Sequence, residues 1–86
     1  MKTFLLTISS PDGALFSGQV ERITLRGAEG DLAVMAGHVP FITSVQPGDC
    51  AVHLEDGTRK QATTEGGLLT VTHESVTLLT AGFQWT

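Results

Sequence analysis

The sequence has a single cysteine, Cys50, among its 86 residues. One cysteine excludes an intramolecular disulfide and any zinc site built from several cysteines, and it suits a reducing compartment without requiring one. The chain also has no apolar run close to the roughly 18 residues that a membrane-spanning helix needs. Its N-terminal apolar run is too short for the core of a signal peptide. We therefore expect a soluble, cytosol-facing protein.

Basic residues are also few, with five against nine acidic residues and a formal net charge of -4. They are scattered along the chain rather than gathered in one patch that could follow a phosphate backbone. Nucleic acid is therefore not an expected partner. The basic residues are Lys2, Arg22, Arg26, Arg59 and Lys60.

The chain is long enough for one small domain, which we place at residues 1–86, and too short for two. Its hydrophobic content is 41% and its charged content is 16%. These values differ from the low hydrophobicity and high charge of disordered chains, so we expect a folded domain.

No segment has the period of a helix, whereas alternating apolar residues predict strands in several places. We expect a strand over residues 4–8, a short extended piece over 14–17 that ends at Gly18, and a longer strand over 22–26. Asp56-Gly57 predicts a tight hairpin between residues 51–55 and 58–63. A second hairpin is expected between residues 68–72 and 76–80. Together these signals favour an all-β fold, an antiparallel sandwich or flattened barrel.

Residues 27–48 are predicted to be a loop of short extended pieces, because four glycines and two prolines place bends along it. Glu29 and Asp31 stand on either side of Gly30 at the first bend. An acidic loop on a stiff sheet suits contact with another protein. A generic binding module would have the same features.

We expect no catalytic, cofactor or metal site. Cys50 and His53 are three residues apart on a predicted strand, so their side chains face opposite sides and cannot form a nucleophile and base pair. The spacing of Glu29, Asp31 and His38 matches no metal-ligand motif. The glycines at 27–30 and 66–67 lack the spacing of a phosphate-binding loop.

The two aromatic residues near the end of the sequence, Phe83 and Trp85, lie where chains usually fray. They either dock on the sheet or are covered by a partner.

Several short motifs, collinear over nearly the whole chain, resemble the N-terminal domain of the ATP synthase epsilon subunit. None is specific alone, but their order and spacing together make the resemblance strong. The motifs are Ser10-Pro11-Asp12-Gly13, Phe16-Ser17-Gly18, Val20-Glu21, Gly27-Ala28-Glu29-Gly30-Asp31-Leu32, Gly37-His38-Val39-Pro40, Pro47-Gly48, and Gly66-Gly67 with Leu69 and Val71.

The resemblance implies a flattened, ten-stranded β-sandwich at the foot of the rotating central stalk, with no catalytic activity of its own. It implies two interfaces, one with the polar loops of the subunit c ring and one with the gamma subunit, so that the ring turns the stalk. Carried over by position, Glu29, Gly30 and Asp31 would face the ring loops. Ser10, His38 and Thr43 would lie toward gamma.

The resemblance also implies a location at the cytoplasmic face of the bacterial inner membrane, peripheral to it, in a complex that moves protons or sodium ions. Two departures stand out at single positions, Ala36 where the family commonly has proline and Asp31 where it commonly has glutamate. Typical members continue into two C-terminal helices, so we expect this chain to show neither epsilon-type inhibition nor ATP binding. The alternative is a free-standing β-sandwich adaptor.

Overall fold

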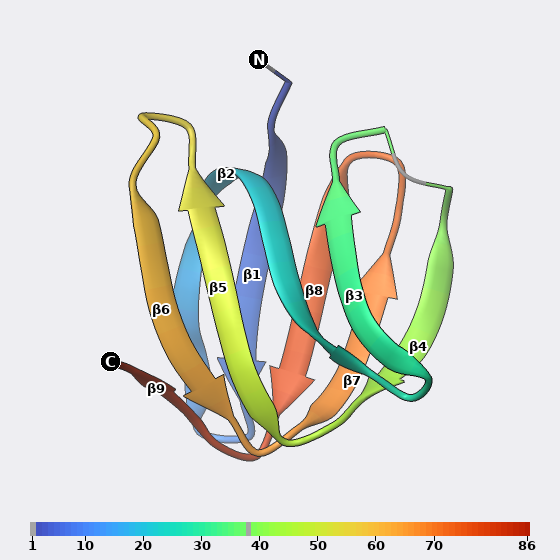
Figure 1. The fold of residues 1–86 in the computed structure, drawn as a ribbon, viewed down its shortest axis with the longest axis vertical. Coiled ribbons are helices and arrows are strands. Elements are labelled where there is room, and N and C mark those ends of the chain that lie inside the picture. Colours follow the sequence, from blue (N-terminus) through green and yellow to red (C-terminus); the bar gives the residue numbers. More distant parts are fainter. Residues whose placement is uncertain (1, 38) are drawn as a thin grey trace.

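The computed structural model describes residues 2–37 and 39–86, and within them the secondary structure is strand alone (Figure 1). The strands in chain order are β1 (Phe4–Ser10), β2 (Gly13–Gly27), β3 (Gly30–Met35), β4 (Phe41–Val45), β5 (Gly48–Leu54), β6 (Arg59–Thr64), β7 (Gly67–Val71), β8 (Ser75–Thr80) and β9 (Phe83–Trp85).

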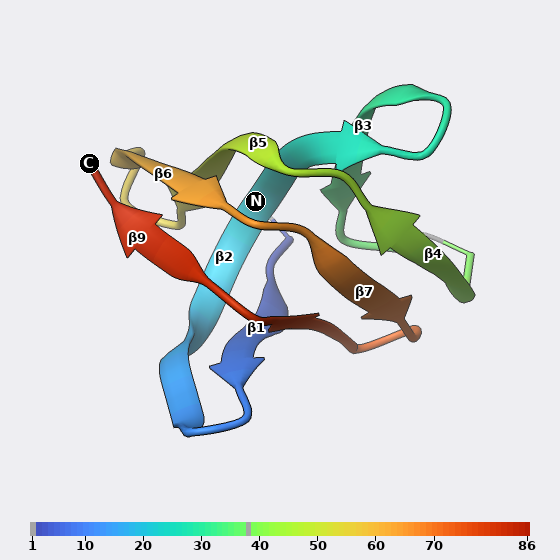
Figure 2. The same ribbon diagram turned by 90° about the horizontal axis from the view of Figure 1, so that it is seen from below.

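The strands form two layers that share β2. The first half of β2 pairs with β1, and β1 continues through β8 and β7 to β4. The second half of β2 pairs with β3 on one edge and β5 on the other, and β5 continues through β6 to β9. Figure 2 shows β2 running across the molecule from its turn with β1 to its hairpin with β3. This arrangement confirms the predicted all-β sandwich.

Alternation along each strand builds the core between the layers. In β1, Phe4, Leu6 and Ile8 are buried while Leu5 is exposed, as the period of two predicts. The same pattern on the other strands gives a core made almost wholly of aliphatic side chains. The largest of its fully buried members are Leu6, Ile8, Ile23, Leu69, Leu78, Val20, Val34 and Val52.

Both predicted hairpins are confirmed. At the β5–β6 turn Gly57 has φ +90°, and the Thr58 amide donates to the Asp56 carboxylate at 2.8 Å. At the β7–β8 turn the Thr72 amide donates to the Ser75 carbonyl at 2.8 Å. The segment 27–48, predicted to be a loop, contains the strands β3 and β4, so the expected short extended pieces are also confirmed. Its described residues include no helix.

Two details differ from the sequence-based expectation. Gly18 does not end a strand, because β2 is continuous and Gly18 pairs with Leu6 of β1. Because β2 pairs with other strands along its length, it continues through Gly18, although a glycine weakens a strand locally. The sheet is also not wholly antiparallel, since β1 and β8 run parallel.

The aromatic residues of β9 dock on the sheet. Trp85 pairs with Ala62 of β6, and its ring packs edge-on against Phe16 and Phe83, with centroid distances of 5.7 and 4.9 Å. Lys60 Nζ lies 4.4 Å from the centroid of the Trp85 ring. The first of the two alternatives for Phe83 and Trp85 is therefore the one observed.

Candidate functional site

The tip of the β2–β3 hairpin presents the predicted acidic residues to solvent. Gly27 pairs with Gly30, so the chain reverses over Ala28 and Glu29, and Gly30 takes φ +130°. Glu29, Gly30 and Asp31 are all exposed. A Cβ on Gly27 would lie 3.2 Å from the Gly30 carbonyl oxygen, so a glycine allows this tight closure. The hairpin thus projects its two carboxylates from a firmly paired base.

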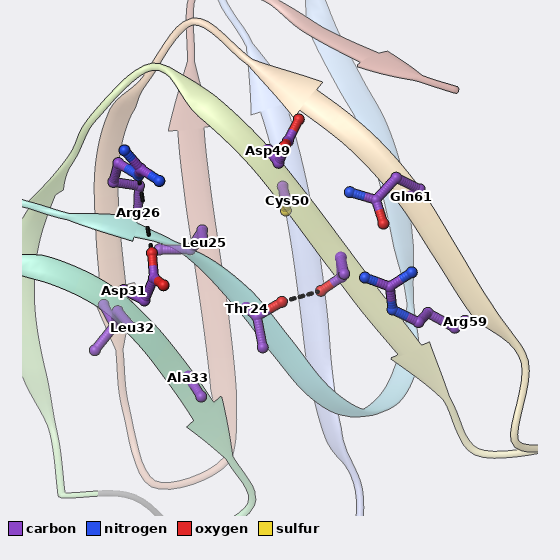
Figure 3. Close-up of a pocket in the computed structure, with 11 residues that line it drawn as sticks. Thr24, Leu25, Arg26, Asp31, Leu32, Ala33, Asp49, Cys50, Arg59 and Gln61 are labelled. Atoms are coloured by element: carbon purple, nitrogen blue, oxygen red, sulfur yellow. Dashed lines mark hydrogen bonds and ion pairs between the residues drawn. The ribbon is translucent and has the colours of Figure 1, made fainter.

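Among the described residues, Asp31 forms one ion pair, with Arg26 directly across the hairpin (Figure 3). The Arg26 Nε lies 3.8 Å from Asp31 Oδ1, and the Asp31 side chain is 90% exposed. An exposed pair of this length is weak and screened by salt. The Asp31 carboxylate therefore remains available to an external partner.

A cavity of about 510 Å³ lies between this hairpin and β4, and it brings together four of the predicted site residues. Glu29, Gly30 and Asp31 line it from the hairpin, and Thr43 lines it from β4. The Thr43 hydroxyl donates to the Ser44 carbonyl at 3.3 Å, which leaves its oxygen lone pairs free to accept. Thr43, expected toward gamma, thus shares a cavity with the residues expected toward the ring.

Ser10 lies apart from this group, at the turn between β1 and β2. Its hydroxyl accepts from the Asp12 amide at 3.2 Å and lies 3.5 Å from the Gly13 carbonyl oxygen, which fixes the turn. His38, the remaining residue expected toward gamma, lies outside the described residues.

The outer face of the layer β4, β7, β8 and β1 lacks charge, a feature that the sequence reasoning missed. On these strands the outward side chains alternate with the core residues, and none of them is charged. Leu68 pairs directly with Leu79, and these two are 44% and 52% exposed. The sequence signal for this face was the uncharged alternate residues of β7 and β8. The face consists of Leu5, Thr7, Ser9, Ile42, Ser44, Leu68, Thr70, Ser75, Thr77 and Leu79.

The outer face of the other layer, in contrast, carries charges of both signs. Its outward residues include Arg22, Arg26, Asp31, Asp49 and Arg59, which come from β2, β3, β5 and β6. A groove of about 440 Å³ runs over this face, and Figure 3 shows Thr24 among its lining side chains. The Thr24 hydroxyl donates to the Ala51 carbonyl oxygen at 3.5 Å. The two faces of the sandwich are thus chemically distinct.

Cys50 and His53 do not form a reactive pair. Cys50 belongs to the core, and burial raises the pKa of its thiol to about 11. His53 is turned to the outer face, where its Nε2 lies 3.3 Å from Arg22 Nη2. Burial first, and then the charges of Arg22 and Arg59, lower the pKa of His53, while Glu21 opposes them. The opposite orientations agree with the prediction from strand spacing.

Within residues 2–37 and 39–86, no three His, Cys, Asp or Glu side chains gather closely enough to hold a metal ion. The same residues include no helix with the length and apolarity to cross a membrane.

Comparison with known sequences gives one consistent result. Residues 3–86 match the sequence model of the family described as "ATP synthase, Delta/Epsilon chain, beta-sandwich domain". The chain is 36% identical over 84 residues to the "ATP synthase epsilon chain, sodium ion specific" of Acetobacterium woodii, which covers 98% of this chain and 63% of that protein.

Comparison with solved structures agrees. A chain in the mitochondrial ATP synthase of Euglena gracilis, solved with OSCP, F1 and the c-ring, has a TM-score of 0.90 and 28% identity over 96% of this chain and 53% of that one. A chain in the central stalk and c-ring of the Tetrahymena thermophila enzyme has a TM-score of 0.77 at 14% identity, over 95% of this chain and 66% of that one, which shows the fold alone. The chain therefore spans between about half and two thirds of the length of these relatives.

Proposed function

Because this chain belongs to the delta/epsilon family of ATP synthase β-sandwich domains, we propose that it is the non-catalytic rotor domain that joins the subunit c ring to the gamma subunit. Residues 1–86 form this single domain. It is peripheral to the membrane, at the cytoplasmic face of a bacterial inner membrane, in an F-type synthase driven by protons or sodium ions.

The β2–β3 hairpin supports the ring contact. Glu29 and Asp31 are exposed on a short turn whose base is held by strand pairing, so their charges have a defined position. Charges on such a rim set orientation and association rate more than total affinity. The hairpin would thus orient the domain on the polar loops of the ring, with Gly30 allowing close approach.

The charge-free face supports the gamma contact, and it is the observation that carries the proposal. Cores of stable interfaces are depleted of charge and rich in apolar groups, and this face offers Ile42, Leu68 and Leu79 with hydroxyl side chains between them. Ser10 lies at the end of β1, next to Ser9 of this face. We assign Ser10 and, by family position, His38 to the contact with gamma. We propose that Thr43 belongs to the contact with the ring, because it lines the same cavity as Glu29, Gly30 and Asp31.

A close-packed sandwich suits this work. The core side chains interdigitate between two hydrogen-bonded layers, and such interiors have low compressibility, so they transmit strain. Torque delivered at the hairpin would reach the charge-free face with little loss.

A binding experiment with matched variants tests the proposal. The chain is immobilised and offered purified gamma and the detergent-solubilised c ring of the same synthase. We expect both to be retained, and we expect Leu79→Glu to weaken gamma binding about tenfold or more while Thr63→Glu, on the opposite layer, does not.

For the ring, Asp31→Lys should weaken retention about tenfold while Asp49→Lys, an exposed carboxylate on the charged face, leaves it unchanged. Thermal melting controls for folding in every variant. Retention of neither subunit by the folded wild-type chain would contradict the proposal and favour the adaptor.

A further inference from the structure

Figure 1 shows that β3 and β5 end on the side of the molecule opposite the tip of the β2–β3 hairpin. A further pocket lies near these strand ends. It has a volume of about 370 Å³. Its lining residues are Lys2, Glu21, Arg22, Met35, Ala36 and His53. None of them belongs to the tip of the hairpin or to the charge-free face, so the proposed function makes no use of this pocket.

Strand register explains why the central groups of the pocket meet. Arg22 of β2 pairs with Met35 of β3 on one side and with His53 of β5 on the other. All three side chains lie on the outer face of the charged layer, so the guanidinium lies between an imidazole and a thioether. Strand pairing therefore holds the Arg22 backbone in a fixed place.

Arg22 has hydrogen-bonding capacity that its surroundings do not use. Its Nη2 is 3.3 Å from His53 Nε2, but its Nε is buried and has no hydrogen-bond partner among the described residues. A buried donor on a charged group without an acceptor is costly, and a guanidinium presents its donors as a planar fork that fits two carboxylate oxygens. Of the guanidinium nitrogens, Arg22 Nε is therefore the buried one left without an acceptor among the described residues.

The charges around the pocket select the sign of its occupant. The cations Lys2 and Arg22 line it, and Glu21 is the one carboxylate among the lining residues. Burial and the charges of Arg22 and Arg59 lower the pKa of His53, so its neutral imidazole does not oppose an anion. Met35 is 51% exposed and, with Ala36, forms an apolar wall. The lining therefore favours an anion that carries a small apolar body.

We propose that this pocket binds a carboxylate carried on a small apolar group, with Arg22 as the main ligand. Such a group occurs at the C-terminus of a polypeptide that ends in an aliphatic residue and in free short-chain acids. A bound carboxylate would accept from the Arg22 guanidinium while its apolar part contacts Met35.

The test uses the 86-residue chain in solution and follows His53 by NMR. Isovalerate serves as the free acid, N-acetyl-leucine mimics a polypeptide C-terminus, and isovaleramide has the same shape without charge. We expect isovalerate or N-acetyl-leucine to raise the His53 titration midpoint by about 0.5 to 1 pH unit, because a nearby anion favours the imidazolium. Saturation is expected on the order of 10 mM for so small a ligand.

Two variants separate binding from a general charge effect. Arg22→Gln should abolish the shift, whereas Arg59→Gln, which also removes a cation acting on His53, should retain it. The Nε–H resonance of Arg22 in a His53→Gln variant gives an independent measurement in which the carboxylate should still cause a shift.

The relative affinity of the two acids identifies the source of the carboxylate. Tighter binding of N-acetyl-leucine indicates a polypeptide terminus, and tighter binding of isovalerate indicates a free acid. The proposal is overturned if neither acid causes a saturable shift, if isovaleramide acts equally, or if the shift persists in Arg22→Gln.

Discussion

The hydroxyl oxygens of Thr64 and Thr80 lie 2.9 Å apart in the interior, where both side chains are buried. Thr80 donates to the Gly66 carbonyl at 2.7 Å, and Thr64 lies 3.2 Å from the Gly82 carbonyl oxygen. The Gly66 amide donates to Thr64 at 3.1 Å. Two side chains thus satisfy the backbone at the ends of β6 and β8, where the chain leaves both layers.

Replacing Thr80 with valine keeps the side-chain shape and removes the hydroxyl. The Gly66 carbonyl would lose its partner, so we expect the free energy of unfolding to fall by about 1 to 3 kcal/mol. Urea unfolding followed by the fluorescence of Trp85, the single tryptophan, measures the change. Thr77→Val on the outward side of the same strand is the control and should be nearly neutral. Equal losses in the two variants would show that the buried network contributes nothing.

Gly57 and Gly66 allow backbone strain to be separated from steric overlap. Their φ angles are +90° and +91°, but an added Cβ meets nothing within 4 Å at Gly57, whereas at Gly66 it lies 2.5 Å from the Val45 carbonyl oxygen. We expect Gly57→Ala to cost about 1 to 2 kcal/mol from the left-handed conformation alone. Gly66→Ala should cost about 1 to 3 kcal/mol more, because a neighbouring backbone must move. Equal midpoints in urea would contradict this reading.

The buried thiol predicts a loss of stability at high pH. The pKa of Cys50 is raised from 9.0 to about 11, so the folded state disfavours the thiolate. Stability from this group is complete below pH 9 and is lost as pH rises toward 11, by about 2 to 3 kcal/mol in full. We expect this decline in urea unfolding of the wild type between pH 9 and 11. The Cys50→Ala variant, although less stable overall, should lack this part of the slope.

The sequence predicts those features of the structure that depend on residues close together in the chain, and not those that depend on distant ones. Alternation located the core positions of β1, and Asp56-Gly57 located a hairpin, because both are local patterns. The pairing of β1 with β8 joins residues about 70 positions apart and carries no local signature, so its parallel direction was not foreseen. Gly18 was misread for the same reason, since its partner Leu6 lies on another strand.

The features of the candidate site also divide into those that local sequence patterns predicted and those that depend on how the strands pack. The exposure of Glu29 and Asp31 followed from glycines that bend the chain at that point. The cavity that joins Thr43 to them depends on how β4 lies beside the hairpin, and the charge-free face requires four strands to be placed side by side. Both features are tertiary, so strand patterns alone could not reveal them.

Arg26 provides a sharper test of the hairpin than its carboxylates do. Its guanidinium partly neutralises Asp31 across 3.8 Å, so in the free domain it competes with any cation that the ring loop would offer. We expect Arg26→Gln to strengthen binding of the c ring about two- to fivefold at low salt, with the gain fading at high salt as charges are screened. Arg59→Gln, which removes the same charge farther from the hairpin, should change binding less. If Arg26 itself contacts the ring, its removal would weaken binding instead. The ring would then recognise the Arg26–Asp31 ion pair rather than the Asp31 carboxylate alone.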